Sequence, residues 1–145
     1  MRAVVQRVRE ARVTIDGVVA GAIERGLLVY LGVGKGDGPR EREWMVDKIT
    51  SLRIFGEDKM NESVLDIAGK LLVVSQFTLY GDVRRGRRPS FDGAMAPAEA
   101  EREYDLFVEA ARARIHVETG RFGASMHVDS INDGPVTIWL DTGAG

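Results

Sequence analysis

The chain has 145 residues, a formal net charge of −2 and no cysteine. One domain usually takes about 100 to 200 residues, so we expect residues 1–145 to form a single domain. A near-neutral chain does not coat nucleic acid through its overall charge; we expect no DNA partner, and any RNA contact must be local. With no run of about 18 apolar residues and no charged-then-apolar leader, the sequence predicts a cytoplasmic protein without membrane contact.

The first part of the chain predicts three strands. Two runs rich in β-branched residues, 3–15 and 18–23, flank Asp16-Gly17, a dipeptide favoured in tight hairpin turns. Residues 27–33 form a third apolar run, which leads into the glycine-rich stretch 34–39. That stretch lacks the Walker spacing of a phosphate loop, so we interpret it as a turn before a helix.

Two amphipathic helices are predicted from apolar residues spaced three and four positions apart. In residues 40–52 the shared face consists of Met45, Ile49 and Leu52. A second helix begins near Pro97, with acidic residues in its first turn. Its apolar stripe consists of Tyr104, Phe107, Val108 and Ala111. Both stripes are typical of core packing rather than of cofactor contact.

The remaining apolar runs predict strands at residues 73–79, 126–131 and 136–140. The run that begins at Leu71 is continuously apolar, which is typical of a strand buried on both faces. Because predicted strands outnumber helices, the expected fold class is α+β: a β-rich sheet or partly closed barrel packed with two main helices.

Polar side chains end this buried strand. Ser75, Gln76 and Thr78 surround Phe77, and buried polar groups need hydrogen-bond partners or a ligand. Neighbouring backbone can supply such partners, so a purely structural interpretation stands beside a functional one. A run of arginines follows directly: Arg84, Arg85, Arg87 and Arg88.

Side chains suited to covalent or metal chemistry are scarce. The two histidines, His116 and His127, have no metal-ligand spacing and are typical of structural or solvated residues. No serine stands in a Gly-x-Ser-x-Gly turn, although a Ser-His-Asp triad assembled by the fold stays open. Thr78 has no adjacent base and is a poor nucleophile. Catalysis by a side-chain nucleophile is therefore poorly supported, and we expect neither a metal nor an organic cofactor.

Segments 75–79 and 132–137 together resemble the paired motifs of the D-aminoacyl-tRNA deacylases, which clear tRNA mischarged with D-amino acids. Further similar stretches occur in the family's order at residues 1–8, 52–55, 59–61 and 118–123. Two departures lie outside the paired motifs: the segment before Lys59 looks shortened, and Ser125 stands where an acid is frequent. The resemblance runs from residue 1 to about residue 141.

The resemblance implies an ester hydrolase that releases a D-amino acid and tRNA, in translation quality control. The substrate would be a tRNA acceptor end whose terminal 2′-hydroxyl assists the attack of water. Backbone N–H groups near Phe77 and Thr78 would hold the developing oxyanion. The implied catalytic residues are Ser75, Gln76, Phe77 and Thr78.

The resemblance also implies a selectivity device at Gly134-Pro135. Only about 5 to 6% of X-Pro bonds are cis, so sequence alone favours trans; the family holds this peptide cis and inserts it into the partner subunit's site. There its carbonyl groups would collide with an L side chain, so we expect a homodimer that rejects L-aminoacyl-tRNA and also hydrolyses glycyl-tRNA. Arg7 would support the loop by bonding its carbonyls, with an exposed strand arginine as the alternative.

Candidate substrate contacts complete the expected site. Phe122, Met126 and Phe91 would face the adenine or the pocket, although aromatic residues in β-rich domains are more often core. The four arginines of residues 84–88 would track acceptor-end phosphates, with a solvated loop as the alternative.

Two other classes of function stay open. A non-catalytic tRNA-binding or proofreading-type module would share the fold, but the intact segments around Thr78 and Gly134 argue against it. A dimeric scaffold protein would tolerate substitutions at both positions in every assay.

Overall fold

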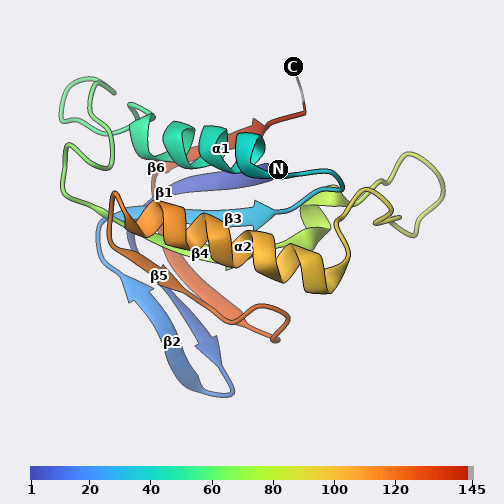
Figure 1. Ribbon diagram of the computed structural model, residues 1–145. Coiled ribbons are helices and arrows are strands. Elements are labelled where there is room, and N and C mark those ends of the chain that lie inside the picture. Colours follow the sequence, from blue (N-terminus) through green and yellow to red (C-terminus); the bar gives the residue numbers. More distant parts are fainter. Residues whose placement is uncertain (144–145) are drawn as a thin grey trace.

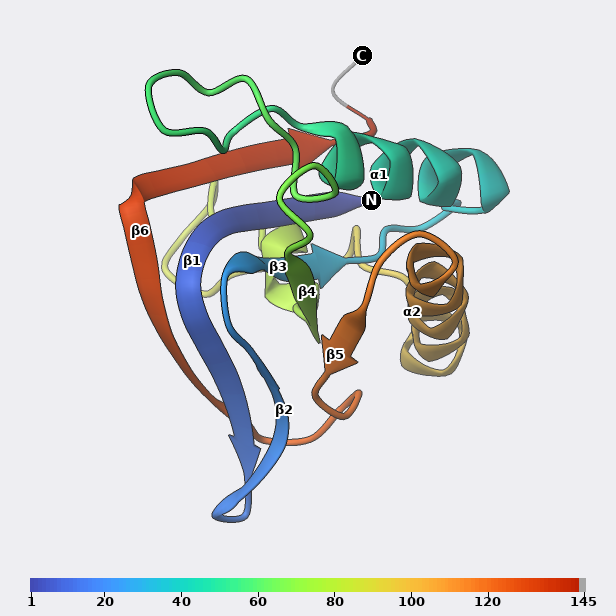
Figure 2. The same ribbon diagram turned by 90° about the vertical axis from the view of Figure 1, so that its left-hand side faces the viewer.

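A strongly curved mixed sheet wraps around a core, and two helices cover one side of it (Figures 1 and 2). The computed structural model describes residues 1–143. The strands are β1 (Arg2–Ile15), β2 (Val18–Ile23), β3 (Gly26–Gly32), β4 (Lys70–Ser75), β5 (Val117–Thr119) and β6 (His127–Asp141). The helices are α1 (Pro39–Ser51), α2 (Pro97–Arg112) and the short 3-10 helix η1 (Phe77–Tyr80). This nearly closed, barrel-like sheet with two helices confirms the predicted α+β class.

The long strand β1 organises the sheet. It pairs antiparallel with β2, β3 and β6, while β4 joins β3 and β5 in parallel register. Asp16 and Gly17 both have positive φ, of 50° and 77°, which suits the tight hairpin predicted between β1 and β2. Hydrogen-bonded neighbours follow the order β2-β1-β3-β4-β5, and β6 lies beside β1.

Strand β4 is buried on both faces, as its uninterrupted apolar run predicted. Leu71 and Val73 belong to the larger core between the sheet and the helices. Leu72 and Val74 belong to a second core, inside the curve of the sheet. Alternate side chains of a strand point to opposite faces, so one four-residue run supplies both cores.

The predicted apolar stripes of both helices face the larger core. Met45 and Ile49 of α1 are fully buried, and so is Phe107 of α2. The Tyr104 hydroxyl donates to the Val73 carbonyl at 2.7 Å, which ties α2 to β4, and burial raises the pKa of Tyr104 above its ordinary value. None of the helices in residues 1–143 is both long enough and apolar enough to span a membrane.

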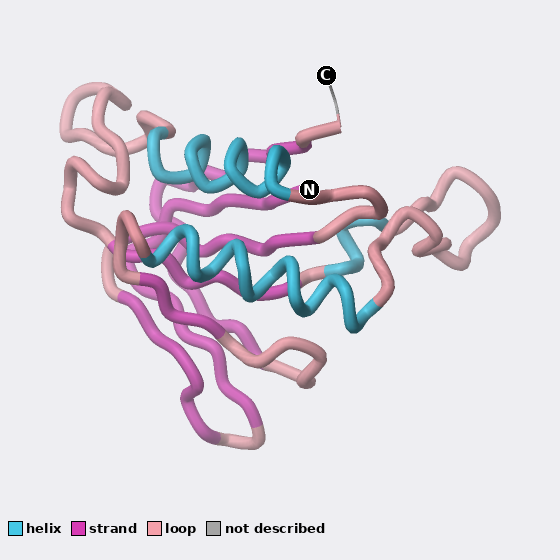
Figure 3. The backbone as a smooth tube through the Cα atoms, in the orientation of Figure 1, coloured by secondary structure: helices cyan, strands magenta, loops and turns pink. Residues whose placement is uncertain are grey.

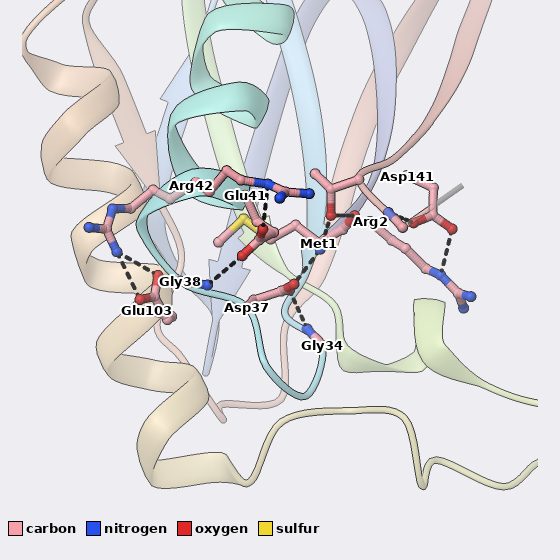
Figure 4. Close-up of polar contacts among 12 residues, drawn as sticks. Met1, Arg2, Gly34, Asp37, Gly38, Glu41, Arg42, Glu103 and Asp141 are labelled. Carbon is pink, nitrogen blue, oxygen red and sulfur yellow. Dashed lines mark hydrogen bonds and ion pairs between the residues drawn. The ribbon is translucent and has the colours of Figure 1, made fainter. Parts of the chain in front are cut away.

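Polar contacts fix the loop before α1, which is a turn as expected (Figure 4). The Asp37 carboxylate accepts from the Gly34 N–H at 2.7 Å and pairs with the Met1 amino group at 2.7 Å. Glu41 caps α1 by accepting from the Gly38 N–H at 3.0 Å. Across the helix pair, one guanidinium nitrogen of Arg42 lies 2.8 Å from both carboxylate oxygens of Glu103.

Two expectations about strand limits are wrong. The strand predicted at residues 73–79 ends at Ser75, and Phe77–Tyr80 form η1 instead. The last ladder bond runs from the Gln76 N–H to the Leu31 carbonyl at 2.8 Å; the chain then turns across Gly32. The strands predicted at 126–131 and 136–140 form the single strand β6, because register shifts in its pairing with β1 absorb the intervening residues.

Candidate functional site

A pocket of about 610 Å³ opens where β4 ends, beside the start of α2. Its volume lies within the range of about 300 to 1,000 Å³ common for small-molecule sites. The lining is mainly apolar and comes from four parts of the chain: Val33; residues 74–77; Phe91 with residues 94–97 and Ala100; and residues 122–124 with Met126 and Val128.

Five of the thirteen predicted site residues line this pocket. Ser75, Gln76 and Phe77 line the pocket at the end of β4 and form its floor, and Phe122 and Met126 line it from the segment before β6. Phe91 also lines it and packs edge-on against Phe77, with ring centroids 5.0 Å apart.

Thr78 is exposed and does not line the pocket. Its hydroxyl oxygen accepts a hydrogen bond from the Gln76 side-chain amide, so the two polar groups satisfy each other in part. Within residues 1–143 neither a carboxylate nor a histidine bonds this hydroxyl. This geometry favours a positioning role for Thr78 over a nucleophilic one.

The backbone of η1 supplies the polar groups that suit a developing negative charge. Phe77 and Thr78 are its first residues, and the first N–H groups of a helix have no acceptor within the helix. Such amides can donate to an oxyanion without any change in fold.

Sequence reasoning missed part of the wall. Met95 and Ala96 lie just before α2, and Ala100 faces the pocket from its first turns. These small or flexible apolar residues carry no pattern that separates a pocket wall from a core. Phe91 lines the pocket together with them, and its prediction as a substrate contact was the one weak indication of this part of the lining.

Gly134-Pro135 lies outside the pocket. The peptide is cis, and Gly134 has a φ of +122°. Arg7 reaches the same segment: its Nε donates to the Asp133 carbonyl at 3.2 Å, and its Nη1 donates to the Ile54 carbonyl at 2.7 Å. Arg7 therefore braces the segment from the carbonyl that precedes Gly134. Within one protomer the fold does not bring the two motifs together.

The four arginines lie on an exposed loop that projects beyond the start of α2 (Figure 3; yellow in Figure 1). Backbone hydrogen bonds of 2.7 and 2.9 Å between Asp82 and Ser90 close the loop. Arg84 donates to both Asp82 oxygens, at 2.9 and 2.7 Å, and these bonds lower the pKa of Asp82 to about 2. Among the described residues, no acidic partner pairs with the other three arginines, Arg85, Arg87 and Arg88.

Neither histidine lines the pocket. His116 pairs with Glu118 at 2.6 Å, and His127 is exposed at the start of β6. In the part of the chain that the structure describes, no group of three or more His, Cys, Asp or Glu side chains is placed to hold a metal ion.

Comparison with known proteins identifies the family. The family model described as D-Tyr-tRNA(Tyr) deacylase matches residues 4–141. The chain belongs to this family. It is 57% identical to the D-aminoacyl-tRNA deacylase of Koribacter versatilis and 57% identical to that of Thermotoga petrophila. Each alignment covers 98% of this chain and 97% of the relative.

Two solved structures share the fold. A protein described as "c-Myc DNA Unwinding Element Binding Protein" superposes with a TM-score of 0.94 at 43% identity, covering 99% of this chain and all of the other. A probable eukaryotic D-amino acid tRNA deacylase shares the fold, with a TM-score of 0.81 at 19% identity over 96% of this chain and 97% of its own. Membership in this family makes the chain an enzyme, a hydrolase acting on carboxylic ester bonds.

Proposed function

We propose that this deacylase works as a homodimer that binds the aminoacylated end of tRNA in the pocket at the end of β4 and rejects L-amino acids with Gly134-Pro135 of the partner. The observation that carries the proposal is the separation of the two motifs. Ser75, Gln76 and Phe77 line the pocket, whereas Gly134-Pro135 lies outside it in the same protomer. A second copy of the chain would supply the missing half of the site.

The reaction needs no covalent catalysis by the protein, because an aminoacyl ester is already an activated acyl group. Water attacks the ester carbonyl with assistance from the adjacent 2′-hydroxyl of the adenosine. The negative charge that develops on the carbonyl oxygen is held by the amides of Phe77 and Thr78, and the carbon–oxygen bond to the ribose then breaks. Preorganised donors of this kind contribute about 2.7 to 4 kcal/mol each.

The enzyme would select the D configuration by sterically excluding L amino acids. A thousandfold preference requires about 4 kcal/mol, whereas one extra methylene in an apolar pocket supplies about 1 to 3 kcal/mol. A steric clash with backbone carbonyls reaches the larger value, because the backbone segment cannot move aside as a side chain can. Arg7 would hold that segment through the Asp133 carbonyl at 3.2 Å.

The surface of β6 supports the dimer. Strand β6 pairs with β1 alone among the described strands, so its other edge is open for a second copy of the chain. Two large apolar side chains on this strand are half exposed, Ile131 at 48% and Trp139 at 52%.

The first test compares matched D-tyrosyl-tRNA and L-tyrosyl-tRNA without added metal. We expect rapid loss of the D ester and survival of the L ester. Equal loss of both would keep an esterase but remove the Gly134-Pro135 filter. Loss of neither, with tRNA binding intact, would favour the non-catalytic tRNA-binding module.

Glycyl-tRNA should be hydrolysed as well. Glycine has no side chain to meet the carbonyls of the filter, so steric exclusion cannot reject it. The measurement is loss of the glycyl ester at rising enzyme concentration, beside L-alanyl-tRNA as the matched control. If glycyl-tRNA resists at concentrations that clear the D-tyrosyl ester, exclusion is not the whole mechanism.

The arginine loop should make the affinity for tRNA depend on salt. Arg84 is engaged by Asp82, which leaves Arg85, Arg87 and Arg88 to contact phosphates. Three contacts on a single strand predict that log K falls against log salt with a slope of about −2. Changing these three arginines to Gln should bring the slope close to zero, while Arg12→Gln on the sheet surface serves as the control. An unchanged slope in the triple variant would remove the loop from the tRNA interface.

A further inference from the structure

Arg2 connects the neighbouring strands β3 and β6 to η1, the turn whose Phe77 and Thr78 amides are proposed to hold the oxyanion. It stands near the start of β1, opposite Gly32 of β3 and Asp141 of β6. Its Nη1 donates to the Leu79 carbonyl at 3.0 Å, and its Nε donates to Asp141 Oδ2 at 3.1 Å. Figure 4 shows the bond to Asp141. The guanidinium also lies 4.4 Å from the centre of the Tyr80 ring.

The side chain of Arg2 can reach η1 because its neighbour in β3 is a glycine. A Cβ on Gly32 would lie 3.0 Å from the Gln76 carbonyl oxygen and 3.3 Å from atoms of Leu79 and Tyr80. The turn therefore rests directly on the backbone of β3. Gly34 makes the same kind of room for the Tyr80 ring. Gly32 and Gly34 thus leave room for η1 to pack closely on the backbone, and Arg2 contacts the same turn through the Leu79 carbonyl and the Tyr80 ring.

We propose that Arg2 is a positioning residue that fixes η1, and with it the amides of Phe77 and Thr78, in the orientation that the reaction requires. The inference rests on the proposed function. Leu79 follows Thr78 directly, so a charged donor on the Leu79 carbonyl limits rotation of the same short turn. A hydrogen bond from a charged donor is about twice as strong as a neutral one.

The contacts of Arg2 require a guanidinium group, because a positive charge alone would not make all of them. Arg2 donates through two different nitrogens to two acceptors and also stacks on Tyr80. A lysine has one point of charge and no planar face, so it cannot make this set of contacts at once.

The same pair of strands contains a matched control. Arg12 also lies in β1 and also pairs across to β6, with its Nε 3.5 Å from Asp129 Oδ2. Both partners are more than half exposed, and Arg12 has no contact with η1 among the described residues. Arg12→Lys thus changes a β1–β6 ion pair in the same way without touching the turn.

The experiment compares Arg2→Lys, Arg12→Lys and Asp141→Asn. We expect Arg2→Lys to lower kcat for D-tyrosyl-tRNA about tenfold with KM nearly unchanged, because orientation of the amides counts mainly in the transition state. Asp141→Asn keeps the bond to Leu79 and should have a much smaller effect. Arg12→Lys should match the unmodified enzyme.

A second measurement is independent of activity. Amide hydrogen exchange at Leu79 and Gly81 reports η1, since these N–H groups bond the Gln76 and Thr78 carbonyls at 3.3 and 2.9 Å. Exchange at both should be faster in Arg2→Lys than in Arg12→Lys, while exchange at the buried amides of β4, which report global opening, shows separately any general loss of stability. Equal exchange and equal kcat in the two variants would overturn the inference. An unmodified enzyme inactive on D-tyrosyl-tRNA would overturn the proposed function, and exchange would still decide the role of Arg2 in fixing the turn.

Discussion

Replacing Gly134 with alanine should abolish most D-aminoacyl-tRNA hydrolysis while leaving the pocket of the same protomer intact. Gly134 has a φ of +122°, which L side chains rarely adopt, and a Cβ there would lie 2.9 Å from Arg7 Nη2 and from Val136 Cγ2. Because the segment would face the α-carbon of the substrate in the partner's pocket, a segment pushed out of place by the new methyl group should block the D ester as well, and we expect a drop of at least a hundredfold in kcat/KM. The cost in stability should be about 1 to 3 kcal/mol, typical of a residue held in a sparsely populated backbone region. Thermal melts of the variant separate the two effects.

Mixed dimers test whether the segment acts on the partner. A Gly134→Ala protomer keeps its own pocket, and a Phe77→Pro protomer keeps its own Gly134-Pro135. If the segment works in the partner's site, each mixed dimer contains one complete site. Random pairing of equal amounts should then restore about a quarter of the original activity, although neither variant is active alone. No recovery, with mixed dimers demonstrated by mass, would mean that the segment does not act across the dimer.

Replacing Phe77 with proline should have the second large effect. Proline removes the backbone N–H, and it suits the first position of a helix, where that N–H has no helical acceptor. The preceding residue, Gln76, has φ −146° and ψ 80°, outside the helical region that a following proline disfavours. The fold should therefore tolerate the change, while the reaction loses one oxyanion donor.

Phe77→Ala is the matched control, since it also removes the ring but keeps the N–H. Relative to this control, kcat for D-tyrosyl-tRNA in Phe77→Pro should fall about 10² to 10³-fold, the usual cost of one oxyanion donor. Thr78→Ala, which removes only a hydroxyl bonded to Gln76, should stay within about tenfold of the unmodified enzyme. If Thr78→Ala were inactive and Phe77→Pro resembled Phe77→Ala, the hydroxyl rather than the backbone would carry the chemistry.

The spacing of apolar residues in the sequence predicted those helices and strands whose side chains form the two cores. The stripes of α1 and α2 and the doubly buried run of β4 are long enough for burial alone to determine their structure. The pattern failed at the end of β4, where Phe77 and Thr78 have high β propensity but begin η1. Tertiary packing overrides propensity here, because Gly32 lets the chain turn directly across β3.

The site was predictable only in part. Polar residues at the end of a buried strand indicated the pocket lining at the end of β4, whereas the role of Gly134-Pro135 stays a prediction from the family resemblance. The wall formed by residues 94–97 could not be predicted, because small apolar residues in a loop have no distinguishing period. The arginine loop shows another limit: composition counts four equivalent cations, whereas the fold engages Arg84 with a neighbouring carboxylate.

The double burial of β4 also limits how this enzyme can change its substrate range. Val74 lines the pocket and also packs in the second core, so a substitution there that reshapes the pocket also disturbs that core. Residues 94–97 and 123–124 line the pocket without belonging to either core, and connecting segments of this kind should tolerate replacement better. Substitutions that give new preferences for the amino acid or for the tRNA end should therefore arise in these segments, while β4 keeps its apolar residues.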